Sequence, residues 1–447
     1  MQSTLLQNGE WLQKRDGLNR FNVGCFLGYF IIGLIIAYQA IFKQDDSDLI
    51  AHIYAISKIG KVNFPQMGFE YTVYALSKIS RLNIQITAIF LFSFALGCQA
   101  YITYFVINKL VLIKNWVCLL FTIVTMTCFS LYVPLHQIQQ VLSHYIYASS
   151  PFIIDKLIST VISFFSDNAY TGIGSPNEWT SPTLIMVKPL GLIITYLYLS
   201  QKNNKTSVLI SILLAISCFY KPSFATIFVP AVMLHEFYKN TFVMALKRIC
   251  IMIIPACLIL ACMFFVLSFV FKMQNGEHTQ IILDPFGVIH FYAKNAIGAF
   301  VQALFFPILI FIICFRKIIH HNQFLLFSWL MLFFGYLYWA LFAQTGHLYA
   351  DANFKWGYEL GLSFVFIFSI IEYLKLGCRL RDDQASKKLN TQSNKKSKIL
   401  FFILTLALCL QFLAGIGCLS SLLFKISFLK VGASYLLHLI SDAKLFI

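Results

Sequence analysis

The sequence predicts an all-α protein that crosses a membrane many times. Of its 447 residues, 59% are hydrophobic and only 12% are charged, and the mean hydropathy is +0.75, far outside the range of soluble globular domains. Apolar runs of roughly 20 residues, the length that crosses about 30 Å of hydrocarbon, recur along the chain. They lack the alternating pattern of a membrane β-barrel, so we expect one helix bundle formed by residues 1–447.

About eleven helical spans account for these runs, within a range of ten to thirteen. We place them at 22–42, 84–108, 116–134, 184–200, 206–220, 222–238, 249–271, 297–315, 323–343, 358–374 and 399–420. The first span follows Lys14, Arg15 and Arg20 and is too long for the core of a signal peptide, which predicts a cytoplasmic N-terminus.

Lysine and arginine then gather in short loops on the side of the N-terminus, as the positive-inside rule requires. This orientation places four longer segments on the outer face: 43–83, 135–183, 272–296 and 344–357. The least hydrophobic stretch, 375–398, is expected to be a mobile basic linker in the cytoplasm.

The charge and the cysteines exclude other classes of protein. The formal net charge of +16 follows from the topology and does not indicate nucleic-acid binding, because its basic blocks face the headgroups of membrane lipids. Most of the 12 cysteines lie in apolar spans without paired spacing, which favours packing over disulfides or metal ligation.

The first outer segment has two stretches of helical periodicity separated by the breaker region Asn63–Gly68, which predicts two interfacial amphipathic helices. Asp45, Asp46 and Asp48 stand at the start of the first helix, and His52 lies one turn after Asp48. Carboxylates cap helix N-termini, but one is enough and neighbouring acids repel. The three acids therefore suit catalysis as a general base, with a divalent cation at Asp45 and Asp46 as an option. His52 suits either interfacial packing or substrate binding.

The second outer segment, residues 135–183, is predicted to end as an ordered lid. Two glycines and three prolines between Tyr170 and Pro189 rule out a continuous helix, and irregular backbone at a membrane is tolerated where it lines a cavity. Trp179 lies in this lid, and Lys188 follows it at the outer interface. Both are candidates for substrate binding, although Lys188 could also snorkel to the interface.

A second lysine is predicted to lie recessed below the outer surface. About 13 apolar residues precede a turn at Lys221 and Pro222, and as a helix they reach only roughly 20 Å. A basic group at that depth is costly, so we expect Lys221 to contact a phosphate.

The last outer loop places His347, Asp351, Lys355 and Glu359 at successive steps of four. If the loop is helical, all four line one face and can contact a substrate. Gly346 makes a partly irregular, solvated loop an equal alternative.

An aspartate-containing first outer loop with interfacial helices, directly after the first of ten to thirteen spans, resembles the GT-C superfamily of integral-membrane glycosyltransferases. The strings SPNEWTSPTLIMVKP, FYKPSF and DANFKWGYE also look like those of bacterial surface-polysaccharide proteins. The resemblance implies a polyprenyl-phosphate-linked sugar donor, and a first-loop aspartate, Asp45 or Asp46, as catalytic base or metal ligand. A tryptophan-rich signature such as oligosaccharyltransferases carry is missing, which favours a glycan or lipid acceptor over a protein.

Two other functions stay open. An O-antigen or capsule repeat-unit polymerase uses lipid-diphosphate glycans on the same face, but that family is expected to have arginine-rich outer loops, and here these loops hold only Arg81. A flippase for lipid-linked sugars tends to show repeated halves and ionisable groups near the bilayer midplane, and the sequence shows no such repeat.

Overall fold

The computed structural model describes residues 20–43, 48–59, 68–131, 174–200, 203–270, 280–293, 295–345, 349, 352–385 and 391–424. It confirms the all-α fold class. The helices are α2 (Arg20–Lys43), α3 (Asp48–Ser57), α4 (Gly68–Ser80), α5 (Ile84–Leu110), α6 (Asn115–Thr127), α10 (Pro182–Ser200), α11 (Asn204–Tyr220), α12 (Ser223–Lys239), α13 (Phe242–Val270), α14 (Gly287–Tyr292), α15 (Ala296–His321), α16 (Gln323–Leu341), α17 (Lys355–Ala385) and α18 (Thr391–Phe424). Within the described residues the only strands, β1 (Ile281–Leu283) and β2 (Phe342–Gln344), pair antiparallel with Ile282 opposite Ala343.

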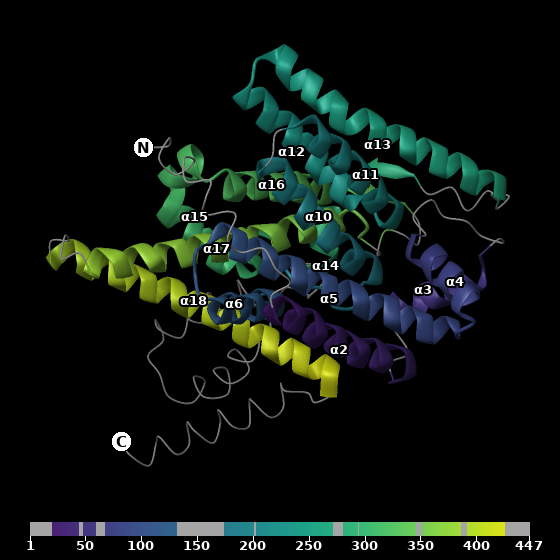
Figure 1. Cartoon of the computed structure of the whole chain (residues 1–447), viewed down its shortest axis with the longest axis horizontal. Coiled ribbons are helices and arrows are strands. Elements are labelled where there is room, and N and C mark those ends of the chain that lie inside the picture. Colours follow the sequence, from purple (N-terminus) through teal and green to yellow (C-terminus); the bar gives the residue numbers. More distant parts are fainter. Residues whose placement is uncertain are drawn as a thin grey trace.

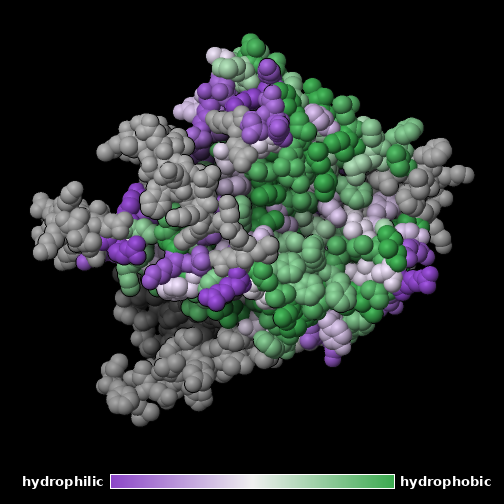
Figure 2. Space-filling model, viewed as in Figure 1, coloured by the Kyte–Doolittle hydropathy of each residue, from purple (hydrophilic) through white to green (hydrophobic). Residues whose placement is uncertain are grey.

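Eight helices of the described chain are long and apolar enough to cross a membrane, namely α2, α5, α10, α13, α15, α16, α17 and α18. The other three predicted spans fall on α6, α11 and α12, which have 13, 17 and 17 residues. The long helices run in roughly the same direction (Figure 1), and hydrophobic residues cover the middle of the face that Figure 2 shows, with hydrophilic residues towards its margins. The protein is therefore a multi-pass membrane protein.

The centre of the bundle is α17, because 83% of the residues in its most apolar stretch are buried. It packs closely on α16, because Gly361 brings the two backbones together: a Cβ there would lie 2.7 Å from the Cα of Leu332. Near its start α17 carries Lys355, Trp356 and Glu359, and this helix therefore fixes the positions of these three side chains.

Two predicted boundaries are wrong. In the span predicted at 116–134, the helix α6 ends at Thr127. The buried backbone after it forms hydrogen bonds with other helices instead: the Phe129 N–H donates to the Gln411 carbonyl, and the Leu131 N–H donates to the Gln302 carbonyl. The linker predicted at 375–398 is mostly helical in the described residues, since α17 continues through Ala385 and α18 begins at Thr391.

The segment predicted at 43–83 contains two helices, as expected: α3 and α4 lie on either side of residues 60–67, which are outside the described part of the chain. α4 starts against the end of α11, where a Cβ on Gly68 would lie 2.4 Å from the carbonyl oxygen of Phe219. Tyr71 stacks on Phe219, and the hydroxyls of Thr72 and Tyr220 are 3.1 Å apart. These contacts bring α4 next to the turn between α11 and α12.

The described part of the predicted lid, Gly174–Ser181, is a buried non-helical segment inside the bundle and does not cover its surface. It begins at Gly174, whose φ of +71° favours glycine and whose Cβ would lie 2.7 Å from the Tyr358 ring. The Asn177 amide donates to the carbonyls of Thr125 and Cys128, both at 2.8 Å, and so closes the open end of α6. Residues 135–173 of the lid prediction lie outside the described residues.

Candidate functional site

Ionisable side chains from six parts of the chain lie close enough to influence one another electrostatically, near the end of the bundle where α3 and α4 lie (Figure 1). We call this group the polar cluster; it consists of Asp48, His52, Glu70, Glu178, Lys188, Lys221, Lys355 and Glu359. All four of its carboxylates are close enough to interact electrostatically with Lys221. The structure therefore brings together the described residues that the sequence predicted separately at Asp48, Lys188 and Lys221.

The first-loop helices hold a histidine between two acids. The Nδ1 atom of His52 lies 2.6 Å from Oε1 of Glu70 on α4, and Nε2 faces Oδ1 of Asp48, one turn earlier on α3, at 3.6 Å. Glu70 is 4% exposed, and its second oxygen has no hydrogen-bond partner among the described residues, whereas the side chain of Asp48 is 39% exposed. A buried carboxylate thus orients the ring, and the accessible carboxylate is Asp48.

Lys221 lies in the predicted turn between α11 and α12, and its ammonium is held from two sides. Its Nζ donates to the Thr183 hydroxyl at 3.0 Å and lies 3.8 Å from the centre of the Trp356 ring. Burial lowers the pKa of Lys221 to about 8, while nearby carboxylates, Asp48 first among them, oppose that shift. An ammonium has three N–H groups, so one hydrogen bond to Thr183 leaves capacity for an anionic ligand.

The other two lysines make internal contacts. The Lys188 Nζ donates to the Pro176 carbonyl at 2.9 Å, which fastens α10 to the Gly174–Ser181 segment. Lys355 and Glu359 form an ion pair of 3.0 Å on α17, with Glu359 fully buried. Both lysines therefore position backbone and acids, and their predicted contact with substrate stays a prediction.

Trp179 was predicted to bind substrate, but the structure buries it in the core. It is 3% exposed and stacks on Phe129 with ring centres 5.7 Å apart. Its neighbour Glu178 accepts hydrogen bonds from the backbone N–H and the hydroxyl of Thr180. Glu178 is the ionisable side chain of the Gly174–Ser181 segment. The geometry thus gives Trp179 a packing role and adds Glu178 to the site.

Four predicted site residues, Asp45, Asp46, His347 and Asp351, lie outside the described part of the chain. The first two immediately precede α3. The described part of the loop predicted at 344–357 is not one helix, because residues 352–354 form a turn and α17 starts only at Lys355.

The described residues contain no group of three or more histidine, cysteine or acidic side chains that could hold a metal ion. The predicted divalent-cation site depends on Asp45 and Asp46, which lie outside the described residues, so it stays a prediction.

Sequence reasoning missed Glu70, Glu178 and Trp356. Glu70 left a signal: it is an acid between Phe69 and Val73, on a helix face that is otherwise apolar and buried. A lone acid on such a face indicates a buried polar contact, because a carboxylate enters the core only with a partner.

The polar cluster combines an accessible carboxylate, a histidine fixed by a second acid, and a cation on an aromatic ring. Such groups can accept a proton from a hydroxyl and stabilise a departing anion. No protein-family model and no curated protein matches this chain.

Proposed function

We propose that this protein is a membrane glycosyltransferase that moves a sugar from a polyprenyl-phosphate donor to a hydroxyl group on a glycan or lipid acceptor. The observation that carries the proposal is that Lys221, a cation at the turn between α11 and α12, lies close enough to Asp48 and Glu70 to feel their charges. His52 lies between those two acids. A proton acceptor next to an anion-binding group is what this transfer needs.

In the proposed reaction the acceptor hydroxyl oxygen attacks C1 of the donor sugar. The bond between C1 and the phosphate oxygen breaks, and the lipid phosphate leaves with the electron pair. Lys221 stabilises the charge of the leaving phosphate, so no strong acid is required. Asp48, the accessible carboxylate, takes the proton of the hydroxyl, and His52 supports it from a ring position fixed by Glu70.

The reaction is proposed for the outer face of a bacterial inner membrane. α3 and α4 lie at the end of the bundle where α2 ends (Figure 1). At the opposite end, Arg248 and Arg379 bind the buried carboxylates of Glu236 and Glu372. The positive-inside rule assigns the arginine-bearing end to the cytoplasm.

The test is the structure of the cell-surface glycan, measured by gel ladder and mass spectrometry in strains with and without the gene. We expect loss of one sugar residue with the length ladder intact, restored by the wild-type gene and not by Lys221→Met. Collapse of the ladder to one repeat unit would instead identify a polymerase. An unchanged lipid-linked glycan trapped on the cytoplasmic side would identify a flippase, and either result would overturn the proposal.

A further inference from the structure

The segment between the spans α13 and α15 carries large apolar side chains on its outside. We call β1, β2 and α14 the ribbon unit. Ile281 and Leu283 of β1 are 64% and 68% exposed, and Phe291 of α14 is 60% exposed. Asp284 is the only residue of 280–293 with a formal charge. The outward surface of this segment is therefore mainly apolar, unlike that of a loop in water.

The strand β1 lacks the alternation of a strand that has one side in water. Successive side chains point to opposite faces of a strand, so a half-solvated ribbon alternates apolar and polar residues. Ile281, Ile282 and Leu283 are all apolar, and all three are exposed. Both faces of β1 are therefore suited to apolar surroundings.

The ribbon unit lies directly on the end of the span α16. β2 starts at Phe342, the residue after α16, and pairs with β1 so that Leu283 lies opposite Phe342. The Asp284 N–H donates to the carbonyl of Leu341, the last residue of α16, at 2.9 Å. The 19 residues of α16 rise about 28 Å, close to the thickness of the hydrocarbon core. Three strand residues add at most about 10 Å, so β1 lies at the edge of that core.

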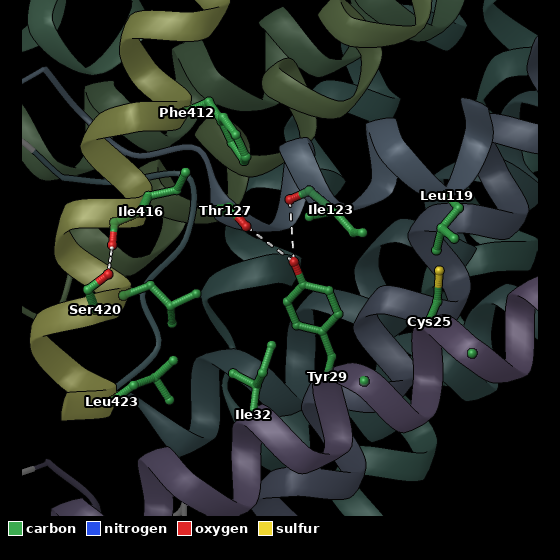
Figure 3. Close-up of a pocket in the computed structure, with 13 residues that line it drawn as sticks. Cys25, Tyr29, Ile32, Leu119, Ile123, Thr127, Phe412, Ile416, Ser420 and Leu423 are labelled. Carbon is green, nitrogen blue, oxygen red and sulfur yellow. Dashed lines mark hydrogen bonds between the residues drawn. The ribbon is translucent and has the colours of Figure 1, made fainter. Parts of the chain in front are cut away.

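The apolar lining of a cavity between α2, α6 and α18 does not mark a membrane boundary in this way. This cavity of about 310 Å³ runs along the sides of two spans, and Figure 3 shows Ile32, Leu119 and Phe412 among its walls. The hydrocarbon core requires apolar side chains of any span. The ribbon unit is different, because it lies past the end of a span, where water would favour polar side chains.

The backbone of the ribbon unit excludes the hydrocarbon core as its place. Within the described residues the sheet has two strands, so β1 and β2 each keep one edge without strand hydrogen bonds. Such backbone groups need water or lipid headgroups, which the core lacks. Apolar side chains on this backbone fit the boundary between headgroups and acyl chains, where interfacial elements bury an apolar face about 5 to 10 Å deep.

We propose that the ribbon unit inserts into the leaflet at this end of the bundle and places Ile281, Leu283 and Phe291 among the upper parts of the acyl chains. The lipid-facing surface of the neighbouring span continues into the unit, since Ile297 in the first turn of α15 is also exposed. A specific protein partner would need about one hydrogen bond per 100–200 Å² of interface. The one acid of the segment, Asp284, is already bound within the protein.

The ribbon unit also holds the turn that leads to the polar cluster. The Asn353 amide donates to the Gln344 side chain, and the Phe342 and Phe354 rings pack with their centres 5.9 Å apart. Phe354 directly precedes Lys355 of the polar cluster. The inserted unit therefore fixes this part of the cluster relative to the lipid surface, and the insertion does not depend on the proposed reaction.

The experiment uses the wild-type full chain in phosphatidylcholine nanodiscs with two photoreactive lipids. One phosphatidylcholine carries a diazirine near the top of its acyl chain, and the other carries it at the chain end. The exposed Leu258 of α13 is the reference for the hydrocarbon core, and the exposed Asn204 at the polar start of α11 is the reference for water. We expect the upper probe to label residues 280–293 at least about fivefold more than Asn204. The chain-end probe should label Leu258 at least about fivefold more than residues 280–293.

Labelling of residues 280–293 by the upper probe at the level of Asn204 would overturn the proposal, because the unit would then project into water. Labelling by the chain-end probe at the level of Leu258 would also overturn it, because the unit would then lie in the core. The variant Leu283→p-benzoylphenylalanine identifies the neighbour directly. We expect adducts with lipid, and adducts with a second copy of the chain or with another protein would contradict the assignment.

Discussion

Replacing Lys221 by methionine removes the cation of the polar cluster and keeps most of its aliphatic stem. Methionine can still cover the Trp356 ring, so the packing of the turn should persist. The lost interaction is a hydrogen bond between charged groups, which contributes about 1.5 to 3 kcal/mol. At about 1.4 kcal/mol per factor of ten, the apparent affinity for the lipid-phosphate donor should fall about 10- to 150-fold.

The assay is a donor titration of purified protein in nanodiscs, with Lys58→Met as the matched control. Lys58 follows α3 and is exposed, with its Nζ 4.2 Å from the Tyr54 ring. Its charge is screened by water, so its removal should change donor affinity less than about twofold. Equal losses in the two variants would refute the reasoning, because they would show that surface charge and not the recessed ammonium binds the donor.

Four further predictions follow from the site. Glu70→Gln should lower the transfer rate about 10- to 100-fold with little change in donor affinity, because it weakens the hold on the His52 ring; a loss confined to affinity would contradict this. Gly68→Val should displace α4 from α11 and lower both the transfer rate and the melting temperature, checked against Gly417→Leu. Since the pKa of Lys221 is lowered to about 8, its ammonium loses its proton above that value, so donor affinity should fall between about pH 7 and about pH 9, and Lys221→Arg should flatten that profile. The double variant Asp45→Asn and Asp46→Asn removes the predicted divalent-cation site and should abolish transfer at normal protein levels in the membrane, whereas full activity would exclude that site.

Much of the fold could be predicted because the bilayer imposes a length on apolar runs. The turn at Lys221 was also predicted, and the structure places Lys221 between α11 and α12 with 9% exposure. Its depth below the outer membrane surface stays a prediction. The pairing of Asp48 with His52 needed only helical spacing.

What the sequence could not provide was the path of irregular backbone. Glycines and prolines predicted a break before α10, but not that Gly174–Ser181 enters the bundle and buries Trp179. Glu70 depends on the docking of α4, which a close backbone contact between Gly68 and Phe219 decides. Contacts between segments far apart in the chain leave no periodic pattern, so a single sequence does not reveal them.

The central claim is tested most directly by cleavage of the bond between sugar and phosphate in a reconstituted system. Purified protein in proteoliposomes receives a polyprenyl-phosphate donor with a radiolabelled sugar, together with cell-surface glycan as acceptor. We expect label on the glycan and free lipid phosphate in equal amounts, with neither product from Lys221→Met at low donor concentration. Movement of intact donor across the bilayer without release of lipid phosphate would contradict the account and identify a transporter.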